Sequence, residues 1–238
     1  MVSNGETLKL AVIPARGGSK RIPRKNIKKF CGRPILSYSI EAAIQSGLFN
    51  EVMVSTDDDE IAGVAKQYGA SVPFLRSAET SNDYASTSDV LLEVIEMYRQ
   101  AGREFSHICS LYPTAPFVTS EKLVRAFRLL CSSGADSLVP VVPFSYPPLR
   151  GFALQNGRIR MRWPEYEAAR SQDLQPIYHD CGQFYFAHME AFLREKTMFC
   201  RETVPMFLPE LEVQDIDNET DWELAELKYG LLQRKGLL

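Results

Sequence analysis

Short apolar runs alternate with helix-like segments along most of this 238-residue chain, and that alternation restricts the folds it can adopt. Strands are predicted at residues 8–14, 51–55, 107–111, 136–142, 183–187 and 207–216. Helices are predicted at residues 34–46, 57–68, 86–100, 119–130 and 218–233. Because strands and helices take turns, we expect an α/β fold: a doubly wound, Rossmann-like, mostly parallel sheet with helices on both faces.

Polar residues at the predicted helix starts support these boundaries, because an N-cap side chain can accept hydrogen bonds from free backbone N–H groups. The capping pairs are Ser86 with Asp89, Asp57 with Glu60, and Asn218 with Asp221. The helix at 86–100 also carries an apolar stripe made of Val90, Leu91, Val94, Ile95 and Tyr98. One face of this helix should therefore pack against the sheet.

One segment, residues 144–175, breaks the alternation. It is rich in proline, arginine and aromatic residues, and Asn156-Gly157 between two short β-like runs predicts a type I′ hairpin. We expect residues 1–238 to form one domain, from which this segment projects to grip another subunit or to cover a site.

The net charge and the cysteine content limit which binding partners and which cellular compartment we expect. The net charge of −3 gives no general attraction to nucleic acid or to an anionic membrane. No apolar run approaches the roughly 18 residues of a membrane-spanning helix, and no signal peptide is recognisable. The five cysteines are odd in number and form no CxxC pair, which favours reduced thiols. We expect a cytoplasmic protein with no nucleic-acid or membrane partner.

The stretch ARGGSKRIPRKN, residues 15–26, follows the first predicted strand and narrows the function most. Residues 16–29 contain seven lysines or arginines and no acid. Gly17 and Gly18 allow close approach of backbone N–H groups, and the cationic side chains can surround phosphate oxygens. Ligands of open α/β sheets bind at the carboxyl ends of strands, so a triphosphate fits this loop. The pattern is neither GxxxxGK[ST] nor GxGxxG, which disfavours a P-loop kinase and a nicotinamide dehydrogenase.

This loop closely resembles the signature loop of the acylneuraminate cytidylyltransferases, the CMP-sialic acid synthetases. The resemblance covers nearly the whole chain and continues through STDD at 55–58, Arg76, TSD at 87–89, PTAP at 113–116 and DID at 215–217. LYPTAPF at 111–117 and YHDCGQFY at 178–185 are similar to the pseudaminic acid branch of the family. The neuraminate branch commonly has glutamine where Tyr112 stands.

The resemblance implies attack by the anomeric hydroxyl of an acidic nine-carbon sugar on the α-phosphorus of CTP, with pyrophosphate leaving. We take pseudaminic acid as the acceptor, for surface-glycan or flagellin glycosylation. The alternatives within this class are N-acetylneuraminate, legionaminate and 3-deoxy-manno-octulosonate.

Two functions from other classes are disfavoured by the sequence. A non-catalytic nucleotide-binding module is disfavoured because Arg16, Lys25, Asp215 and Asp217 are all present. A nucleic-acid-binding protein is disfavoured because the positive charge is confined to one loop of an acidic chain.

The resemblance also implies roles for single residues on the nucleotide side. The residues expected to bind CTP are Arg16, Gly17, Gly18, Ser19, Lys25, Asn26, Arg76, Thr87 and Ser88. Arg16 and Lys25 are also expected to be catalytic, because they hold the reacting phosphates. Thr87 and Ser88 open a predicted helix, and their alternative role is to cap it.

Asp215 and Asp217 are the expected ligands of a Mg²⁺ ion and the remaining catalytic residues. They stand two residues apart, so in an extended segment both carboxylates face the same way. Hard oxygen ligands suit Mg²⁺, which also binds substrate phosphates and water. The ion would offset phosphate charge and orient the α-phosphate for in-line attack.

The acceptor sugar is expected to contact Tyr112, Asp180, Gln183 and Tyr185. Gln183 offers an amide to a hydroxyl or acetamido group, and Asp180 or His179 could position or deprotonate the attacking hydroxyl. Cys181 is expected to be a small packing residue, because direct displacement needs no covalent intermediate.

Two further expectations concern the segment at 144–175. The cation for the sugar carboxylate is left open among Arg150, Arg158, Arg160 and Arg170. The segment matches the region that forms the dimer contact in the family, so a homodimer is expected, with a lid on a monomer as the alternative.

Overall fold

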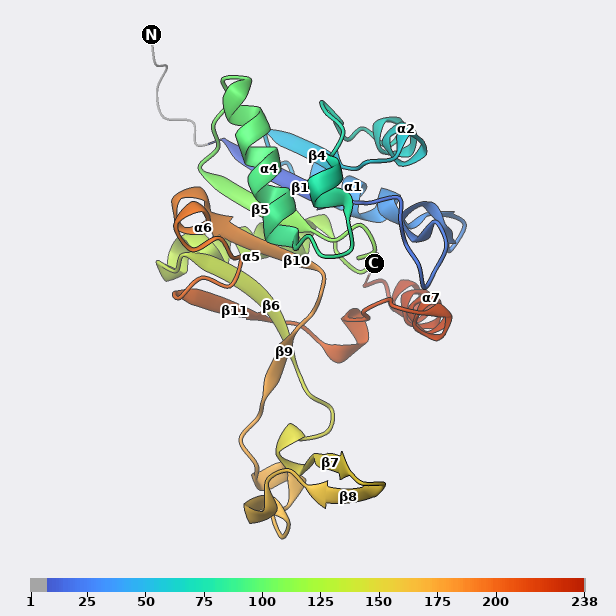
Figure 1. The fold of residues 1–238 in the computed structure, drawn as a ribbon, viewed down its shortest axis with the longest axis vertical. Coiled ribbons are helices and arrows are strands. Elements are labelled where there is room, and N and C mark those ends of the chain that lie inside the picture. Colours follow the sequence, from blue (N-terminus) through green and yellow to red (C-terminus); the bar gives the residue numbers. More distant parts are fainter. Residues whose placement is uncertain (1–7, 238) are drawn as a thin grey trace.

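The computed structural model describes residues 8–237, which build a sheet between two layers of helices, with a long arm projecting from one end (Figure 1). The strands of the central sheet are β1 (Lys9–Pro14), β4 (Glu51–Ser55), β5 (His107–Leu111), β6 (Ser137–Pro143), β9 (Tyr178–Asp180), β10 (Phe184–His188) and β11 (Thr203–Phe207). The helices are α1 (Ile35–Gln45), α2 (Asp59–Gln67), α3 (Ala78–Ser81), α4 (Thr87–Gln100), α5 (Ser120–Ser133), α6 (Met189–Glu195) and α7 (Glu219–Arg234). Two small hairpins are β2 (Lys29–Phe30) with β3 (Arg33–Pro34), and β7 (Phe152–Gln155) with β8 (Arg158–Met161).

The central sheet runs in the order β11-β6-β10-β5-β1-β4, and β9 pairs with β6 outside this path. β1 is parallel to β4 and β5, and β11 is parallel to β6. β10 pairs antiparallel with both β5 and β6. The predicted mostly parallel sheet is confirmed, but the direction of β10 was not predicted. Because β10 is reversed, its first residues lie at the edge where β1, β4 and β5 end.

Helices cover both faces of the sheet, as predicted. On one face, Leu36 of α1 and Leu123 of α5 pack in a buried cluster with Ile13 of β1. On the other face, α4 and α6 pack in a second cluster, in which Leu91 meets Val12 of β1. Neighbouring residues of one strand point to opposite faces, so β1 serves both layers. The predicted apolar stripe of α4 is buried at all five positions.

An aromatic cluster holds α7 beside the loop that follows β1. The ring of Phe30 meets Tyr38, Trp222 and Tyr229 edge-on, with centroids 5.6, 5.7 and 5.4 Å away. Asn218 and Asp221 form the capping box of α7, as predicted for this pair. Since these ring contacts fix the position of α7, the residues just before this helix lie next to the basic loop.

Two predicted boundaries were wrong. The strand predicted at 207–216 lies earlier in the chain, at Thr203–Phe207; beyond it Pro209 has no N–H to extend the pairing, and the chain turns into the short 3₁₀ helix Glu210–Glu212. The helix predicted at 57–68 begins at Asp59, and its N-cap is Asp58, whose carboxylate accepts from the Ile61 N–H at 3.0 Å. The side chain of Asp57 is therefore not used to cap the helix and can bind another group.

The segment after β6 leaves the sheet as an arm, drawn in yellow in Figure 1. The predicted hairpin is confirmed: Asn156 and Gly157 both have positive φ, 49° and 73°, as a type I′ turn requires. The arm returns through β9, which continues the pairing of β6 beyond the sheet. Within residues 8–237, none of the helices combines the length and apolarity that crossing a bilayer requires.

Candidate active site

Two cavities lie at the edge of the sheet where β1 and β5 end. The loop cavity, about 430 Å³, is lined by residues that include Arg16, Ser19, Lys25, Asn26, Tyr112 and Asp217. The Asp180 cavity, about 410 Å³, is lined by residues that include Asp180, Cys181, Gly182, Glu210, Asp215 and Lys228. Asp217 lines one cavity and Asp215 the other, so this pair stands where the cavities adjoin.

The backbone of the basic loop is fixed by the residues that follow β4. The Gly17 N–H donates to the carboxylate of Asp57 at 2.8 Å. A Cβ at Gly17 would lie 2.9 Å from an Asp58 oxygen, so this position requires glycine. Asn26 is buried and donates its amide to the Arg16 carbonyl at 2.9 Å, which ties the two ends of the loop together. A Cβ at Gly18 would meet nothing within 4 Å, so its backbone stays accessible.

The loop cations point to carboxylates from other parts of the chain. Arg16 binds Asp83 at 2.8 Å, and Lys20 forms an ion pair with the same carboxylate. Arg21 binds Asp217 at 2.7 Å. These side chains are one-third to three-quarters exposed, so their ion pairs contribute little to stability and can be exchanged for an anionic ligand.

Arg24 differs from these cations, because its ion pairs stabilise the fold at the start of α2. It binds Asp58 at 2.5 and 3.0 Å and also pairs with Glu60. The hydrogen bonds from Arg24 lower the pKa of Asp58 to about 2. This residue therefore locks the loop to the start of α2 and does not line the loop cavity.

Lys25 reaches between the loop and the segment before α7. Its ammonium donates to the Ile216 carbonyl at 2.8 Å. Burial lowers the pKa of Lys25, and the nearby carboxylates of Asp217 and Asp215 act in the opposite direction. The predicted catalytic residues Lys25, Asp215 and Asp217 are thus brought together by the fold.

The remaining residues predicted to bind the nucleotide lie outside the lining of the loop cavity. Arg76 is buried and donates to the Ser55 hydroxyl and carbonyl at 3.0 and 2.5 Å. Thr87 and Ser88 form the first turn of α4, whose N-cap is Ser86. None of the three lines the loop cavity. Each is still connected to the loop. Arg76 binds Ser55, whose carbonyl accepts from the loop residue Ala15, and Thr87 and Ser88 follow Asp83, which binds Arg16.

Asp215 and Asp217 stand on the irregular segment between β11 and α7. The backbone N–H of Asp217 donates to Asp221 of the α7 capping box at 2.9 Å. Partial desolvation, followed by the charge of Asp217, raises the pKa of Asp215. Two carboxylates that repel each other at the rim of a basic cavity form a suitable donor set for a hard cation.

The predicted acceptor residues are split between the cavity wall and the layer behind it. Asp180 lines the Asp180 cavity and accepts a hydrogen bond from the Tyr185 hydroxyl at 2.5 Å. Tyr185 is buried and meets the ring of Tyr112 edge-on at 5.7 Å. His179 also lines the cavity, with Nδ1 2.9 Å from the Asp180 carbonyl oxygen. Tyr185 can thus orient Asp180 without touching a ligand.

Gln183 lies differently from the expectation, because its side chain is only 1% exposed. Its amide nitrogen donates to the Glu212 carbonyl at 2.6 Å, away from both cavities. Gln183 follows Gly182 into the start of β10, where the alternation of side chains turns it inward.

The four arginines expected as partners of an acceptor carboxylate are absent from both cavity linings. Arg150, Arg158, Arg160 and Arg170 all belong to the arm and line neither cavity of this chain. Lys228 of α7 does line the Asp180 cavity and donates to the Val213 carbonyl at 2.8 Å. Lys228 was missed because a lone lysine on a helix has no motif.

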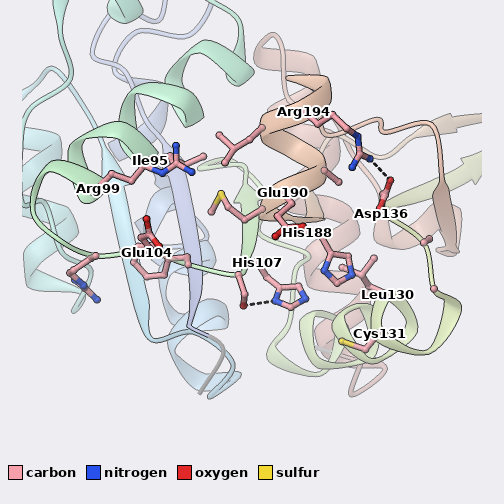
Figure 2. Close-up of a pocket in the computed structure, with 18 residues that line it drawn as sticks. Ile95, Arg99, Glu104, His107, Leu130, Cys131, Asp136, His188, Glu190 and Arg194 are labelled. Atoms are coloured by element: carbon pink, nitrogen blue, oxygen red, sulfur yellow. Dashed lines mark hydrogen bonds and ion pairs between the residues drawn. The ribbon is translucent and has the colours of Figure 1, made fainter. Parts of the chain in front are cut away.

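A third cavity, about 680 Å³, lies at the opposite edge of the sheet between α4, α5 and α6 (Figure 2). The rings of His107 and His188 meet there with centroids 4.5 Å apart. Two of its three arginines form ion pairs, Arg103 with Glu51 and Arg194 with Asp136. Within residues 8–237, no group of three or more His, Cys, Asp or Glu side chains could hold a metal ion. This cavity contains none of the residues predicted for the site from the sequence.

Comparison with known proteins was made for sequence and for structure. A model of the cytidylyltransferase family matches residues 10–212. Pseudaminic acid cytidylyltransferase from Campylobacter jejuni is 43% identical over 221 residues, which are 92% of this chain and 95% of that protein. CMP-N,N'-diacetyllegionaminic acid synthase from Legionella pneumophila is 38% identical, over 94% of this chain and 97% of that protein. N-acylneuraminate cytidylyltransferase A from Danio rerio is 35% identical, over 92% of this chain and 51% of that protein.

Two solved structures share the fold. A CMP:2-keto-3-deoxy-manno-octonic acid synthetase complexed with CTP aligns with a TM-score of 0.65 at 19% identity, over 96% of this chain and 100% of that one. A 4-diphosphocytidyl-2C-methyl-D-erythritol synthase from Anaerococcus prevotii aligns with a TM-score of 0.66 at 10% identity, over 94% and 99%. At these identities the two likenesses support the nucleotidyltransferase-like fold.

His107 generates a prediction about pH and stability. Its Nε2 is buried without a hydrogen-bond partner, and burial, with the charges of His188 and Lys9, lowers its pKa to about 4. The unfolded chain binds this proton near pH 6.5, so it holds more protons than the folded protein between about pH 6.5 and 4. Stability should therefore fall as pH falls through this window, by up to about 1.4 kcal/mol per pH unit from this residue.

The measurement is urea unfolding of wild type and His107→Gln from pH 7 to 4.5. The wild type should lose stability more steeply than the variant. Equal slopes would show that His107 is not held neutral.

Proposed function

The chain belongs to the cytidylyltransferase family, and from this membership we propose that it transfers CMP from CTP to the anomeric hydroxyl of pseudaminic acid. The observation that carries the proposal is the pair of adjoining cavities, one basic and one walled by Asp180, with Asp215 and Asp217 where they adjoin. A nucleotide and an acidic sugar can bind side by side there. Identity of 43% to the Campylobacter jejuni enzyme over nearly its full length supports pseudaminic acid.

The loop cavity would hold the triphosphate. Arg16 and Lys20 would exchange Asp83 for phosphate oxygens, and the accessible N–H of Gly18 can add a backbone donor. Lys25, fixed by its hydrogen bond to Ile216, would face the phosphate that reacts. Because Lys25 and the loop backbone are held in place by other parts of the protein, little reorganisation of these groups is needed as charge moves onto pyrophosphate.

Asp215 and Asp217 would hold Mg²⁺. Desolvation and then the charge of Asp217 raise the pKa of Asp215; a bound cation would offset both effects, and hard carboxylate oxygens match the ion. Two carboxylates are enough, because Mg²⁺ usually completes its coordination with water and substrate phosphates. When bound, the ion supplies charge neutralisation and orientation of the α-phosphate.

The Asp180 cavity would hold the acceptor. Asp180, oriented by the Tyr185 hydroxyl, is placed to accept a hydrogen bond from the attacking hydroxyl and to receive its proton. Lys228 supplies positive charge in the same cavity for the sugar carboxylate. Cys181 is buried, and burial raises the pKa of its thiol to about 12, so it stays a packing residue.

Legionaminate is the first alternative acceptor, because the Legionella pneumophila synthase is 38% identical over nearly all of both chains. The acceptor is decided by measuring pyrophosphate release from CTP in the presence of Mg²⁺. Four acceptors are compared: pseudaminic, legionaminic, N-acetylneuraminic and 3-deoxy-manno-octulosonic acids. We expect release with pseudaminic acid at a kcat/KM at least tenfold above the others, about 1.4 kcal/mol of discrimination. Preference for another acid would keep the reaction and overturn the acceptor.

Asp217→Asn tests the metal assignment. The substitution keeps the size of the side chain but weakens a hard anionic ligand, so kcat should fall on the order of a hundredfold while the fold is retained. Asp136→Asn, which removes the ion pair with Arg194 in the distal cavity, is the matched control and should keep wild-type turnover. Steady-state rates across a Mg²⁺ series make the comparison. A fully active Asp217→Asn protein with unchanged Mg²⁺ dependence would refute the assignment.

We also propose that the protein works as a homodimer joined through the arm. The arm and its base expose large apolar side chains, namely Phe144, Tyr146, Phe152, Leu154, Ile159, Trp163 and Tyr178. Leu154 and Ile159 are direct cross-strand partners in the β7–β8 hairpin and are 76% and 68% exposed. Apolar side chains gathered in this way are typical of a protein contact.

Light scattering tests the dimer. Wild type should give about twice the 26.9 kDa chain mass, and the double substitution Leu154→Glu and Ile159→Glu should give the monomer mass, because paired charges cannot be buried at a contact. Leu227→Glu, on α7 and 71% exposed, is the control and should stay dimeric. A monomeric wild type across micromolar concentrations would contradict the proposal.

A further inference from the structure

A buried polar cluster lies directly behind the wall of the Asp180 cavity. Lys122 of α5 places its ammonium 2.6 Å from the Glu212 carboxylate, and the two side chains are only 10% and 18% exposed. The same ammonium donates to the Phe117 carbonyl at 2.7 Å. Gln183 donates its amide to the Glu212 carbonyl at 2.6 Å. Glu212 is thus held by both its side chain and its backbone.

This cluster is not needed for ordinary packing. A buried ion pair contributes little net stability, because desolvation of both charges offsets their attraction, and apolar side chains of similar size serve a core as well. Burial also lowers the pKa of Lys122, which the hydrogen bond to Glu212 counteracts. A costly arrangement at this place calls for a role beyond holding the fold together.

The segment that the cluster holds has no sheet to fix it. Backbone pairing with β6 ends at Leu208, whose N–H donates to Val141. Glu210, Val213, Gln214 and Asp215 then line the Asp180 cavity. The far end of the segment is held by two other hydrogen bonds. Lys25 donates to the Ile216 carbonyl, and the Asp217 N–H donates to the Asp221 carboxylate. Lys122 and Gln183 hold Glu212 in the middle of the segment, while Ser145 binds Glu210 and Lys228 binds the Val213 carbonyl on either side of it.

We propose that Lys122, Glu212 and Gln183 form a brace that sets the shape of the acceptor cavity. These are positioning residues: none of them touches the acceptor, and they act through the wall formed by residues 210–215. The inference rests on the proposed function of that cavity. It assigns Gln183 an indirect part in choosing the acceptor, in place of the direct contact expected from the sequence.

The brace predicts an asymmetric kinetic effect. The basic loop is fixed by its own contacts with Asp57 and Asn26, which the brace does not share. Loosening the brace should raise KM for the acceptor on the order of tenfold, the loss expected from one hydrogen bond made imperfect, while KM for CTP stays within about twofold. The preference for pseudaminic over legionaminic acid should fall in parallel.

The test uses two variants that remove the brace without leaving an unpaired charge. Gln183→Met keeps the shape and loses the donor, and the double variant Lys122→Met with Glu212→Gln removes both charges together. Lys122→Arg is the conservative variant and should restore acceptor KM to near the wild-type value. Arg128→Met, an exposed position on the same helix, is the control and should change neither KM.

Amide hydrogen exchange is measured on the same proteins, because it reports on the segment whether or not an acceptor is turned over. Exchange in residues 208–215 should quicken in both brace variants, while exchange in residues 15–29 stays unchanged. Folded variants with wild-type acceptor KM, or with equal rises in both KM values, would overturn the proposal. A wild type inactive with every acid would refute the proposed function instead, and unchanged exchange in 208–215 would then overturn the brace itself.

Discussion

Seven positive charges packed into residues 16–29 are the constraint on which much of this structure depends. Such a loop repels itself, so carboxylates from distant parts of the chain must be brought to it. Asp58, Asp83 and Asp217 come from three separate segments, and each binds one or two of the loop cations. The start of α2, the approach to α4 and the approach to α7 therefore converge on the end of β1. The candidate active site is where the charge of the loop is balanced.

The antiparallel strand β10 gives this edge of the sheet its second cavity. In a wholly parallel sheet, only the ends of strands would reach the carboxyl edge. Reversing β10 brings its beginning there, so Gly182 and Cys181 meet the basic loop across Tyr112, whose N–H donates to the Gln183 carbonyl at 2.8 Å. The loop cavity is built from βα turns, and the Asp180 cavity is built around the start of a strand. One edge thus holds two cavities of different chemistry.

Local patterns in the sequence predicted most of the fold and one half of the site. β4 and β5 were predicted to the residue, because compact apolar runs end at clear turns. The strand predicted at 207–216 failed because apolar spacing continues past Pro209 although the ladder cannot. The direction of β10 carries no signal, since side-chain alternation is the same either way. Arg16, Lys25 and Asp217 were predicted from motifs and line the loop cavity, whereas Asp83 and Lys228 reach the cavities or the loop through positions that only the folded chain defines.

The arm and the acceptor cavity share a single pair of strands. Val141 of β6 pairs with Asp180 of β9, and Pro143 pairs with Tyr178, so the ribbon that leads outward to the arm begins with a residue of the cavity wall. The position of Asp180 is therefore tied by backbone pairing to the ribbon from which the arm extends. The outer surface of the arm and the inner shape of the cavity are therefore not independent in evolution. A change that suits a new contact at the tip alters the cavity as well, and divergence in acceptor preference should leave traces along the arm.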